Sequence, residues 1–358
     1  MGNHVSRVDG VHRFLERRTR RTLFAVSVGA VVIVSAADAL TGVELSLSLF
    51  YLIPVMLAAW FVGRPAGIFI SLLSTIGWFL ADIREHPGYA HVGIPYWNAL
   101  MMLGFFLIVV VTLFSLHESR TRETTLSRRI QEDLLRIQRP YPPGVQIASA
   151  WIPSSHVSGD YVDVLPLGVK VAGFCIADAA GQGIPAALLM SNFQATLRAT
   201  ATATVRPEEL CARLNAWMLS HLSAAVFVTL FYGVLDVASG QFTYCNAGHC
   251  RPVLVRSDGT TTLLEEGGIP LGIDDHWEYR QGATVLHTGD RLLLYTDGVT
   301  ENMNGRRELF GEERLAELLR RERKKSAASV RDSVLRAVRA YSGGDFEDDI
   351  TLLYLAVS

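Results

Sequence analysis

Hydrophobic positions divide the chain into two unlike parts. Four apolar stretches occupy the first third, at residues 23–40, 45–62, 66–81 and 98–116. Each is close to the roughly 20 residues that an α-helix needs to cross a bilayer. The pattern therefore predicts four transmembrane helices, forming a membrane anchor or sensor over residues 23–116, behind a basic N-terminus at residues 1–22.

Arginine placement orients these stretches. Arg-rich segments precede the first stretch and follow the fourth, whereas the two outer loops carry few basic residues. The positive-inside rule then places both the N-terminus and the C-terminal part in the cytoplasm, in a multi-pass protein of the cell membrane. A cleaved signal peptide is the alternative for the first stretch, since Ala37-Asp38-Ala39 resembles a cleavage site. Asp38 is either solvated near the outer end of its helix or part of a sensing or ion site.

A charged segment, residues 117–140, separates the apolar region from the rest of the chain. Leu126, Ile130, Leu134 and Ile137 recur in it at helical spacing, which predicts a signalling linker helix with one apolar stripe. The stripe either packs on the chain's own soluble part or pairs two subunits as a short coiled coil. A homodimer through this linker is therefore one of two expectations.

From residue 141 to 358 the pattern becomes that of a mixed soluble domain. Short apolar runs separated by Gly- or Asp-containing turns predict antiparallel strands. Helical runs come in pairs between groups of strands, at residues 184–201, 207–222, 312–322 and 326–342. This grouping, without strict β-α alternation, favours an α+β fold in which helices cover sheets.

Composition and absent motifs narrow the function. The net charge is -2 and no segment is typical of a nucleic-acid module, so nucleic acid is not an expected partner. The chain has no P-loop, kinase-type glycine loop, GxSxG elbow or HExxH sequence. Its four cysteines are scattered and are expected to be reduced and inert, with a zinc or disulfide pair at Cys245 and Cys250 as the alternative.

The candidate chemistry lies where apolar strands end beside aspartate and glycine. Four such turns contain Asp297 with Gly298, Asp178, Asp160 with Asp163, and the pair Asp348 and Asp349. Carboxylate oxygens suit Mg²⁺ or Mn²⁺, and the lack of a His/Cys cluster argues against zinc. If these turns converge, two such ions can activate a water for attack on a phosphoester.

These segments resemble the metal-dependent PPM phosphatases, which are protein phosphatase 2C-like serine/threonine phosphatases, in their bacterial SpoIIE/RsbU branch. The resemblance covers nearly all of residues 130–358 in family order. It rests on SGDYVDV, IADAAGQGIPAALLM, FVTLFYGVLD, YCNAGHCRPVLV, GIPLGI, HTGDRLLLYTDGVTE, LFG and EDDITLL. It implies an antiparallel β-sandwich flanked by helices, and the helix RRIQEDLL resembles the one that precedes the catalytic core in this branch.

The resemblance also implies a set of metal ligands. Asp178 would bridge two Mn²⁺ or Mg²⁺ ions, with the Ala179 carbonyl completing one site. Asp297 and Asp348 would bind the other ion, and these two residues with Asp178 form the implied catalytic set. The remaining implied metal-site residues are Asp349, as a neighbour or alternative ligand, and Asp160, which would hold metal-bound water or a further ion.

Other implied site residues surround this set. Asn246, Gly248 and His249 lie in the NAGH turn, and Gly298 follows the strand-end aspartate. His249 is either structural or the proton donor to the leaving serine oxygen. The chain departs from the family pattern at Ser158, Ala179 and Gln182, and it retains every acidic position.

The implied function is a membrane-anchored phosphatase that removes phosphate from serine or threonine of a regulatory protein. In this branch the substrate is typically a STAS-type anti-sigma-factor antagonist, so the process would be sigma factor regulation. Two alternatives stay open. One is a non-enzymatic membrane receptor whose phosphatase-like domain binds a partner-switching protein, and the other is an enzyme for small phosphoesters.

Overall fold

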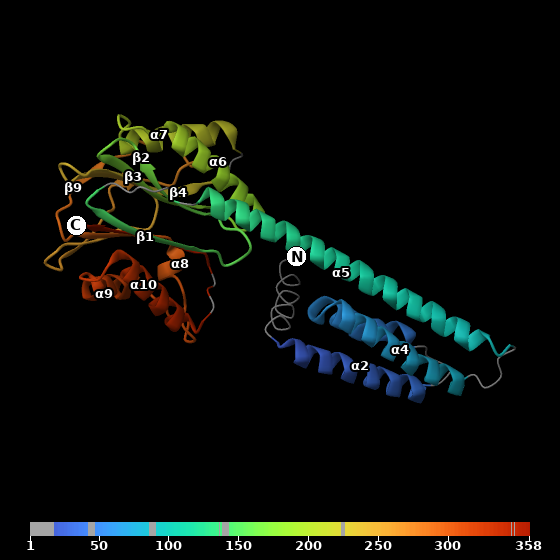
Figure 1. The fold of residues 1–358 in the computed structure, drawn as a ribbon. Helices are drawn as coiled ribbons and strands as arrows, with labels where there is room; N and C mark the ends of the chain where they lie inside the picture. The colour runs from blue at the N-terminus through green and yellow to red at the C-terminus, as the bar shows by residue number, and fades with distance from the viewer. Residues whose placement is uncertain are drawn as a thin grey trace. The chain divides into compact units, whose positions relative to one another are not determined.

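The computed structural model describes residues 18–41, 47–85, 91–135, 137, 143–222, 226–344, 346 and 348–358. Residues 1–17 of the predicted basic N-terminus and residues 136 and 138–140 of the predicted linker lie outside the described residues. The chain divides into two compact units, Met1–Glu123 and Thr124–Ser358 (Figure 1). The predicted boundaries at residues 22, 116 and 140 stay predictions.

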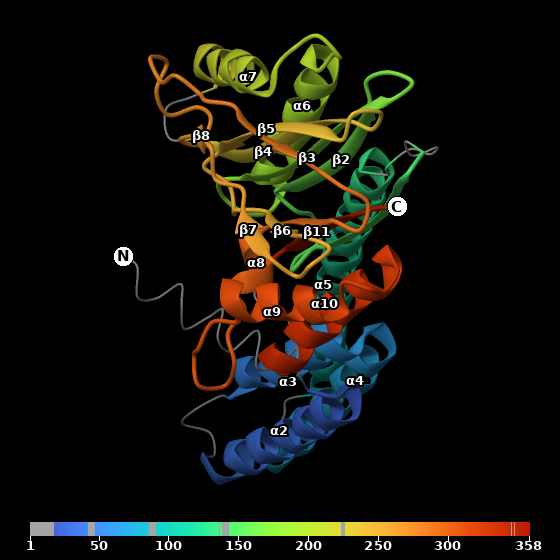
Figure 2. The ribbon, with the colours of Figure 1, turned by 90° about the vertical axis from the view of Figure 1, so that its left-hand side faces the viewer.

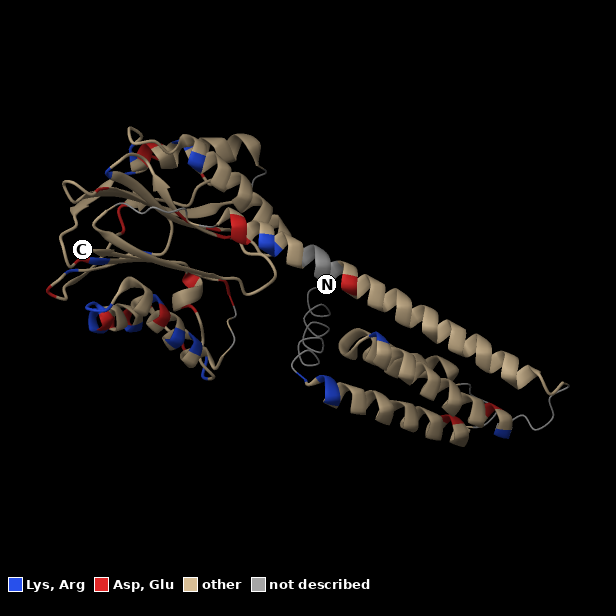
Figure 3. Cartoon of the chain, viewed as in Figure 1, with Lys and Arg blue, Asp and Glu red and all other residues tan. Residues whose placement is uncertain are grey.

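The first unit is helical. Its elements are α2 (Arg20–Thr41), η2 (Ser48–Tyr51), α3 (Leu52–Leu57), η3 (Ala58–Val62), α4 (Arg64–Glu85) and the first part of α5 (Ile94–Leu134). Figure 3 shows Lys, Arg, Asp and Glu near the ends of α2 and α4 rather than along their middles. Three segments are long and apolar enough to cross a membrane, namely Arg20–Thr41, Arg64–Arg84 and Ile94–Ser119.

The prediction of four membrane-crossing helices is therefore wrong, because the described residues contain three helices of sufficient length and hydropathy. The second predicted stretch forms only the shorter apolar run Ser48–Val62. At about 1.5 Å per residue this run covers roughly 22 Å, less than the ~30 Å of a bilayer core. Its backbone also changes from 3-10 to α to π geometry, with Pro54 near the first change. Mean hydropathy reports neither the length of the helical run nor the changes in its helix geometry.

Asp38 lies inside the first unit. Its side chain is 5% exposed and accepts hydrogen bonds from the Tyr51 hydroxyl at 3.2 Å and from the Leu47 N–H at 3.1 Å. The carboxylate thus ties the end of α2 to the start of the following helical run. The solvated alternative for this residue does not hold, because its partners are protein groups.

Two β-sheets form the centre of the second unit. The five-stranded sheet has the order β1-β11-β10-β6-β7, and the six-stranded sheet has the order β2-β3-β4-β5-β8, with β9 paired to β5. All pairings are antiparallel except β5 with β8. The strands are β1 (Val145–Ile152), β2 (Asp160–Pro166), β3 (Val171–Ala179), β4 (Val228–Asp236), β5 (Gln241–Ala247), β6 (Val253–Val255), β7 (Thr261–Leu263), β8 (Gly267–Gly268), β9 (Gly282–Val285), β10 (Arg291–Tyr295) and β11 (Ile350–Val357).

Helices cover the outer faces of these sheets. They are α6 (Ile184–Thr200), α7 (Pro207–His221), α8 (Asp297–Thr300), α9 (Glu312–Glu322) and α10 (Ala327–Ser342). Figure 2 shows α6 and α7 beside the six-stranded sheet, and α9 and α10 beside the five-stranded one. Leu315, Leu318 and Leu319 of α9 recur at helical spacing and are buried against that sheet. The α+β prediction is confirmed.

A separate apolar cluster joins the two sheets. Phe174 and Phe231 of the six-stranded sheet share it with Leu294 and Leu353 of the five-stranded sheet, and all four side chains are buried. The strands that contribute to it are apolar on both faces, because helices cover the other face. The relative position of the two sheets is therefore fixed by packing on both sides of each.

The cysteines behave as inert thiols. All four are free, so the alternative pairing of Cys245 with Cys250 is not formed. Cys175, Cys211 and Cys245 lie in the buried cluster between the six-stranded sheet and its helices. Burial raises the pKa of the Cys175 thiol well above its usual value, which lowers its reactivity.

Candidate metal centre

Strand pairing brings the predicted acids to one edge of the sheets. Asp160 begins β2 and lies opposite Asp178, near the end of β3. Asp297 follows β10, while Asp348 and Asp349 precede β11, which pairs with β10. In an antiparallel pair the end of one strand lies beside the start of the next. Turns far apart in sequence therefore meet.

The carboxylates at this edge raise one another's pKa. Burial raises the pKa of Asp178 to about 7, with added repulsion from Asp297, Asp348 and Asp349. Burial, followed by repulsion from Asp178, raises the pKa of Asp160 well above its usual value. The pKa values of Asp297 and Asp348 are also raised, chiefly by burial. A divalent cation would relieve this repulsion, and an all-oxygen donor set fits Mg²⁺ or Mn²⁺.

Three of the acids already accept hydrogen bonds from protein groups. Asp160 Oδ2 accepts a hydrogen bond from Thr296 Oγ1 at 2.9 Å. Asp349 Oδ1 accepts from the N–H and the hydroxyl of Ser154, at 2.7 and 2.8 Å. Within the described ranges, no three Asp, Glu, His or Cys side chains are close enough as placed to hold an ion. Asp348 Oδ1 accepts the N–H of the adjacent Asp349 at 2.8 Å.

The glycine-rich turn after β3 is shaped by its backbone. Ala179 ends the strand, and its N–H donates to the Gly159 carbonyl at 3.2 Å. Gly181 and Gly183 follow with φ of +107° and +73°, conformations that favour glycine. The turn leads directly into α6, so the main chain beside Asp178 is held from both directions.

The NAGH turn supports the edge from β5. The Asn246 side chain accepts the His249 N–H at 2.7 Å, and Gly248 has a φ of +69°. His249 Nδ1 pairs with the Thr229 hydroxyl at 2.8 Å, and that hydroxyl lies 3.5 Å from the Asp178 carbonyl. Burial lowers the pKa of His249 to about 4. The imidazole is therefore neutral near pH 7, which favours a positioning role over proton donation.

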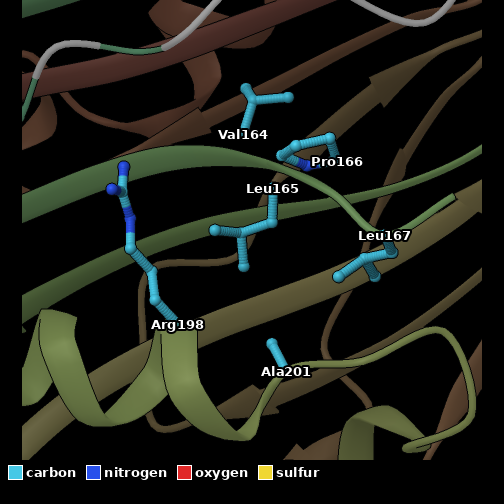
Figure 4. Close-up of a pocket in the computed structure, with 6 residues that line it drawn as sticks. All are labelled: Val164, Leu165, Pro166, Leu167, Arg198 and Ala201. Carbon is cyan, nitrogen blue, oxygen red and sulfur yellow. The ribbon is translucent and has the colours of Figure 1, made fainter.

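Asp163 does not belong to the acidic edge. It stands three residues from Asp160, so the two side chains point to opposite faces of β2. Its buried carboxylate accepts from Arg198 Nε and from the Tyr161 hydroxyl, each at 2.7 Å. Figure 4 shows Arg198 beside β2, where it lines a pocket of about 170 Å³. Grouping Asp163 with the metal-binding turns is thus corrected, since it joins β2 to α6.

Sequence reasoning missed three polar neighbours of the site. Thr296 is buried, bonds to Asp160 and accepts the Thr351 N–H at 3.1 Å, so it holds β2, β10 and β11 together. Ser154 fixes the Asp349 carboxylate, and Thr229 links His249 to the β3 backbone. For Thr296 the available signal is its place beside Asp297 at the end of an apolar strand, whereas Ser154 and Thr229 have no acid next to them in the sequence.

Comparison with solved structures defines the class of protein. The SiaA-PP2C domain of Pseudomonas aeruginosa superposes with a TM-score of 0.59 at 20% identity, covering 67% of this chain and 98% of that one. The RsbU and RsbW domains of a Mycobacterium tuberculosis protein superpose with a TM-score of 0.56 at 28% identity, covering 62% of each chain. The second unit therefore has the PP2C fold.

Sequence comparison identifies the family. The family model described as Stage II sporulation protein E (SpoIIE) matches residues 170–358, and the chain belongs to this family. Phosphoserine phosphatase RsbU of Bacillus subtilis is 32% identical over 192 residues, which are 53% of this chain and 57% of the relative. Phosphoserine phosphatase RsbP of the same species is 33% identical over 186 residues, 50% of this chain and 45% of the relative. The chain spans about half the length of the curated relatives it matches.

Gly298 offers a test of the site's geometry. A Cβ at this position would overlap the Asp349 carbonyl oxygen, so Gly298→Ala must displace the segment that carries Asp348 and Asp349. We expect Mn²⁺ affinity, measured by isothermal titration calorimetry, to fall by about tenfold or more. Gly305→Ala is the matched control, because an added methyl there meets nothing within 4 Å. Equal affinities for the two variants would contradict this geometry.

Proposed function

We propose that this chain is a metal-dependent protein serine/threonine phosphatase. The observation that carries the proposal is the edge where Asp178, Asp297 and Asp348, from three separate strand ends, lie close enough to raise one another's pKa. Two bound Mn²⁺ or Mg²⁺ ions would supply an activated water and neutralise the phosphoryl charge. The proposal includes the antiparallel β-sandwich of the family, which the apolar cluster shared by both sheets supports.

The surroundings of each acid suggest its role. Repulsion from both Asp297 and Asp348 reaches Asp178, which makes it the candidate bridging ligand. The Ala179 carbonyl, at the end of the same strand, would complete one site. Asp349 Oδ1 is held by Ser154 from another segment, whereas Asp348 Oδ1 accepts the N–H of the adjacent Asp349, so Asp348 is the proposed ligand of that pair.

Asp160 and the NAGH turn would act from further out. Asp160 is buried and bonded to Thr296, which suits a carboxylate that orients water rather than one that binds an ion directly. His249 is neutral and bonded to Thr229, so its proposed task is to hold the β3 backbone in place.

The proposed substrate is phosphoserine or phosphothreonine on a regulatory protein. The relatives RsbU and RsbP carry the name phosphoserine phosphatase, which supports this class. The family resemblance narrows the proposal to a phosphorylated STAS-type anti-sigma-factor antagonist. The activity would then belong to signal transduction that regulates a sigma factor.

Phosphate release tests this function. The full chain in lipid nanodiscs should release phosphate from a phosphoserine STAS protein only with Mn²⁺ or Mg²⁺. Asp178→Asn and Asp348→Asn should each lower the rate by more than about a hundredfold, because each removes a ligand rather than an outer partner. Asp258→Asn, in an exposed turn, should leave the rate unchanged. Partner binding without release by the native chain would favour the non-enzymatic receptor.

The chain is proposed to be anchored in the cell membrane with its second unit in the cytoplasm. Three long apolar helices support the anchoring, and the arginines that follow the last of them support the orientation.

Protease accessibility and labelling test this placement. The second unit should be digested by protease only from the cytoplasmic side of sealed vesicles. Three crossings would place the basic N-terminus outside, so labelling of N-terminal residues distinguishes this topology from one with both ends inside. Recovery of the chain in the soluble fraction would refute the anchor.

The apolar stripe of the linker divides into two parts. Ile137 packs against the cluster between the sheets, whereas Leu126, Ile130 and Leu134 are 60%, 53% and 43% exposed. The exposed part recurs at spacings of four and follows an apolar helix of membrane-spanning length. We therefore propose that it pairs two copies of the chain as a short coiled coil.

The oligomeric state tests this pairing. The mass of the protein in nanodiscs or detergent, measured by light scattering, should halve when Leu126→Glu and Ile130→Glu are combined, because two charges would enter the apolar seam. Val169→Glu is the control, since Val169 is 91% exposed and lies in the turn between β2 and β3. A dimer that survives the double substitution, or a native monomer, would contradict the coiled coil.

A further inference from the structure

Gln131 is a buried polar residue on a helix whose neighbouring side chains are exposed. It is 6% exposed. Its Nε2 donates to the Ser158 carbonyl at 2.6 Å, and the Ser158 N–H donates to its Oε1 at 3.0 Å. One side-chain amide thus pairs both main-chain groups of a residue 27 positions along the chain. This is the pairing that a neighbouring strand would otherwise supply.

Ser158 begins the turn that carries Asp160, and this turn is buried. The Ser158 hydroxyl accepts the Asp160 N–H at 3.0 Å, and the Gly159 carbonyl accepts the Ala179 N–H at 3.2 Å. Gly159 lies so close to β3 that a Cβ there would be 3.1 Å from the Ala179 carbonyl oxygen and 3.5 Å from Asp178 Oδ1. The position of Ser158 therefore sets the position of Asp160 against the end of β3.

We propose that Gln131 is a positioning residue of the metal centre, through which the C-terminal end of α5 controls the placement of Asp160. This inference rests on the proposed phosphatase function. If this end of α5 shifts, the amide leaves Ser158 and two buried main-chain groups lose their partners, which destabilises the turn. Docking of α5 therefore adds two hydrogen bonds to those that already hold this turn against β3. The helix needs no contact with an ion to change how well the centre binds it.

A second buried glutamine provides a matched control. Gln194 of α6 is also buried, and its Nε2 donates to the Leu134 carbonyl at 2.6 Å. It holds the same end of α5 but makes no bond to the Ser158 turn. Loss of Gln194 reports on the general stability of this docking, whereas loss of Gln131 reports on the turn itself.

The test uses the full chain in lipid nanodiscs, with Mn²⁺ as the probe. Gln131→Met keeps the length of the side chain but has no amide. We expect its Mn²⁺ affinity, measured by calorimetry, to fall about tenfold or more, as is typical when an outer partner of a metal site is lost. Hydrogen exchange should accelerate at the Ser158 and Asp160 amides. Gln194→Met should change both readouts less than Gln131→Met does, because the Gln131 amide still pairs with Ser158.

Other outcomes would contradict the proposed role of Gln131. Equal effects of the two substitutions, or native affinity and exchange in Gln131→Met, would overturn the inference. If that variant does not fold, Gln131→Glu replaces it. Its carboxylate keeps the bond from the Ser158 N–H but places an acceptor against the Ser158 carbonyl, so it too should lower the Mn²⁺ affinity and accelerate exchange at Ser158. If the native chain binds no Mn²⁺, the proposed function fails, and the exchange of the Ser158 turn alone decides the role of Gln131.

Discussion

The crowding of partly buried carboxylates at one edge of the sheets is the constraint on which this molecule depends. Burial is the largest cause of the raised pKa of Asp178, and repulsion from Asp297, Asp348 and Asp349 adds to it. Such an arrangement costs stability unless the surrounding fold holds it or a cation offsets it. The acidic edge is therefore a place where the chain gives up stability, and this is characteristic of a functional site.

The rest of the second unit holds this edge together. The strand register places Asp160 opposite Asp178, and β10 beside β11 brings the other acids to them. Because α6 and α7 cover one sheet and α9 and α10 the other, neither sheet can shift without breaking a packed face. The α5 helix contributes through Gln131, whose side-chain amide bonds both main-chain groups of Ser158 in the turn before Asp160.

The sequence predicts features that depend on neighbouring residues, but it does not predict contacts between residues that are far apart in the chain. An apolar run ending in Asp-Gly identifies Asp297, because a strand's end and the turn after it are local properties. Asp163 looked equivalent, but its partner Arg198 is 35 residues away and on another element. The Ser48–Val62 run was apolar enough to be counted as a membrane span, but hydropathy does not show where helix geometry breaks. The role of Gln131 could not be predicted from the sequence, because it depends on a contact with Ser158, 27 residues away.

The central claim is that acids from separate strand ends form one two-ion site. Anomalous X-ray scattering at the manganese edge, from crystals of the chain grown with Mn²⁺, tests it most directly. We expect two anomalous-difference peaks, one on either side of the Asp178 carboxylate. One of the two should also lie beside Asp297 and Asp348. No peak at this edge at saturating Mn²⁺, or peaks only beside other acids, would contradict it.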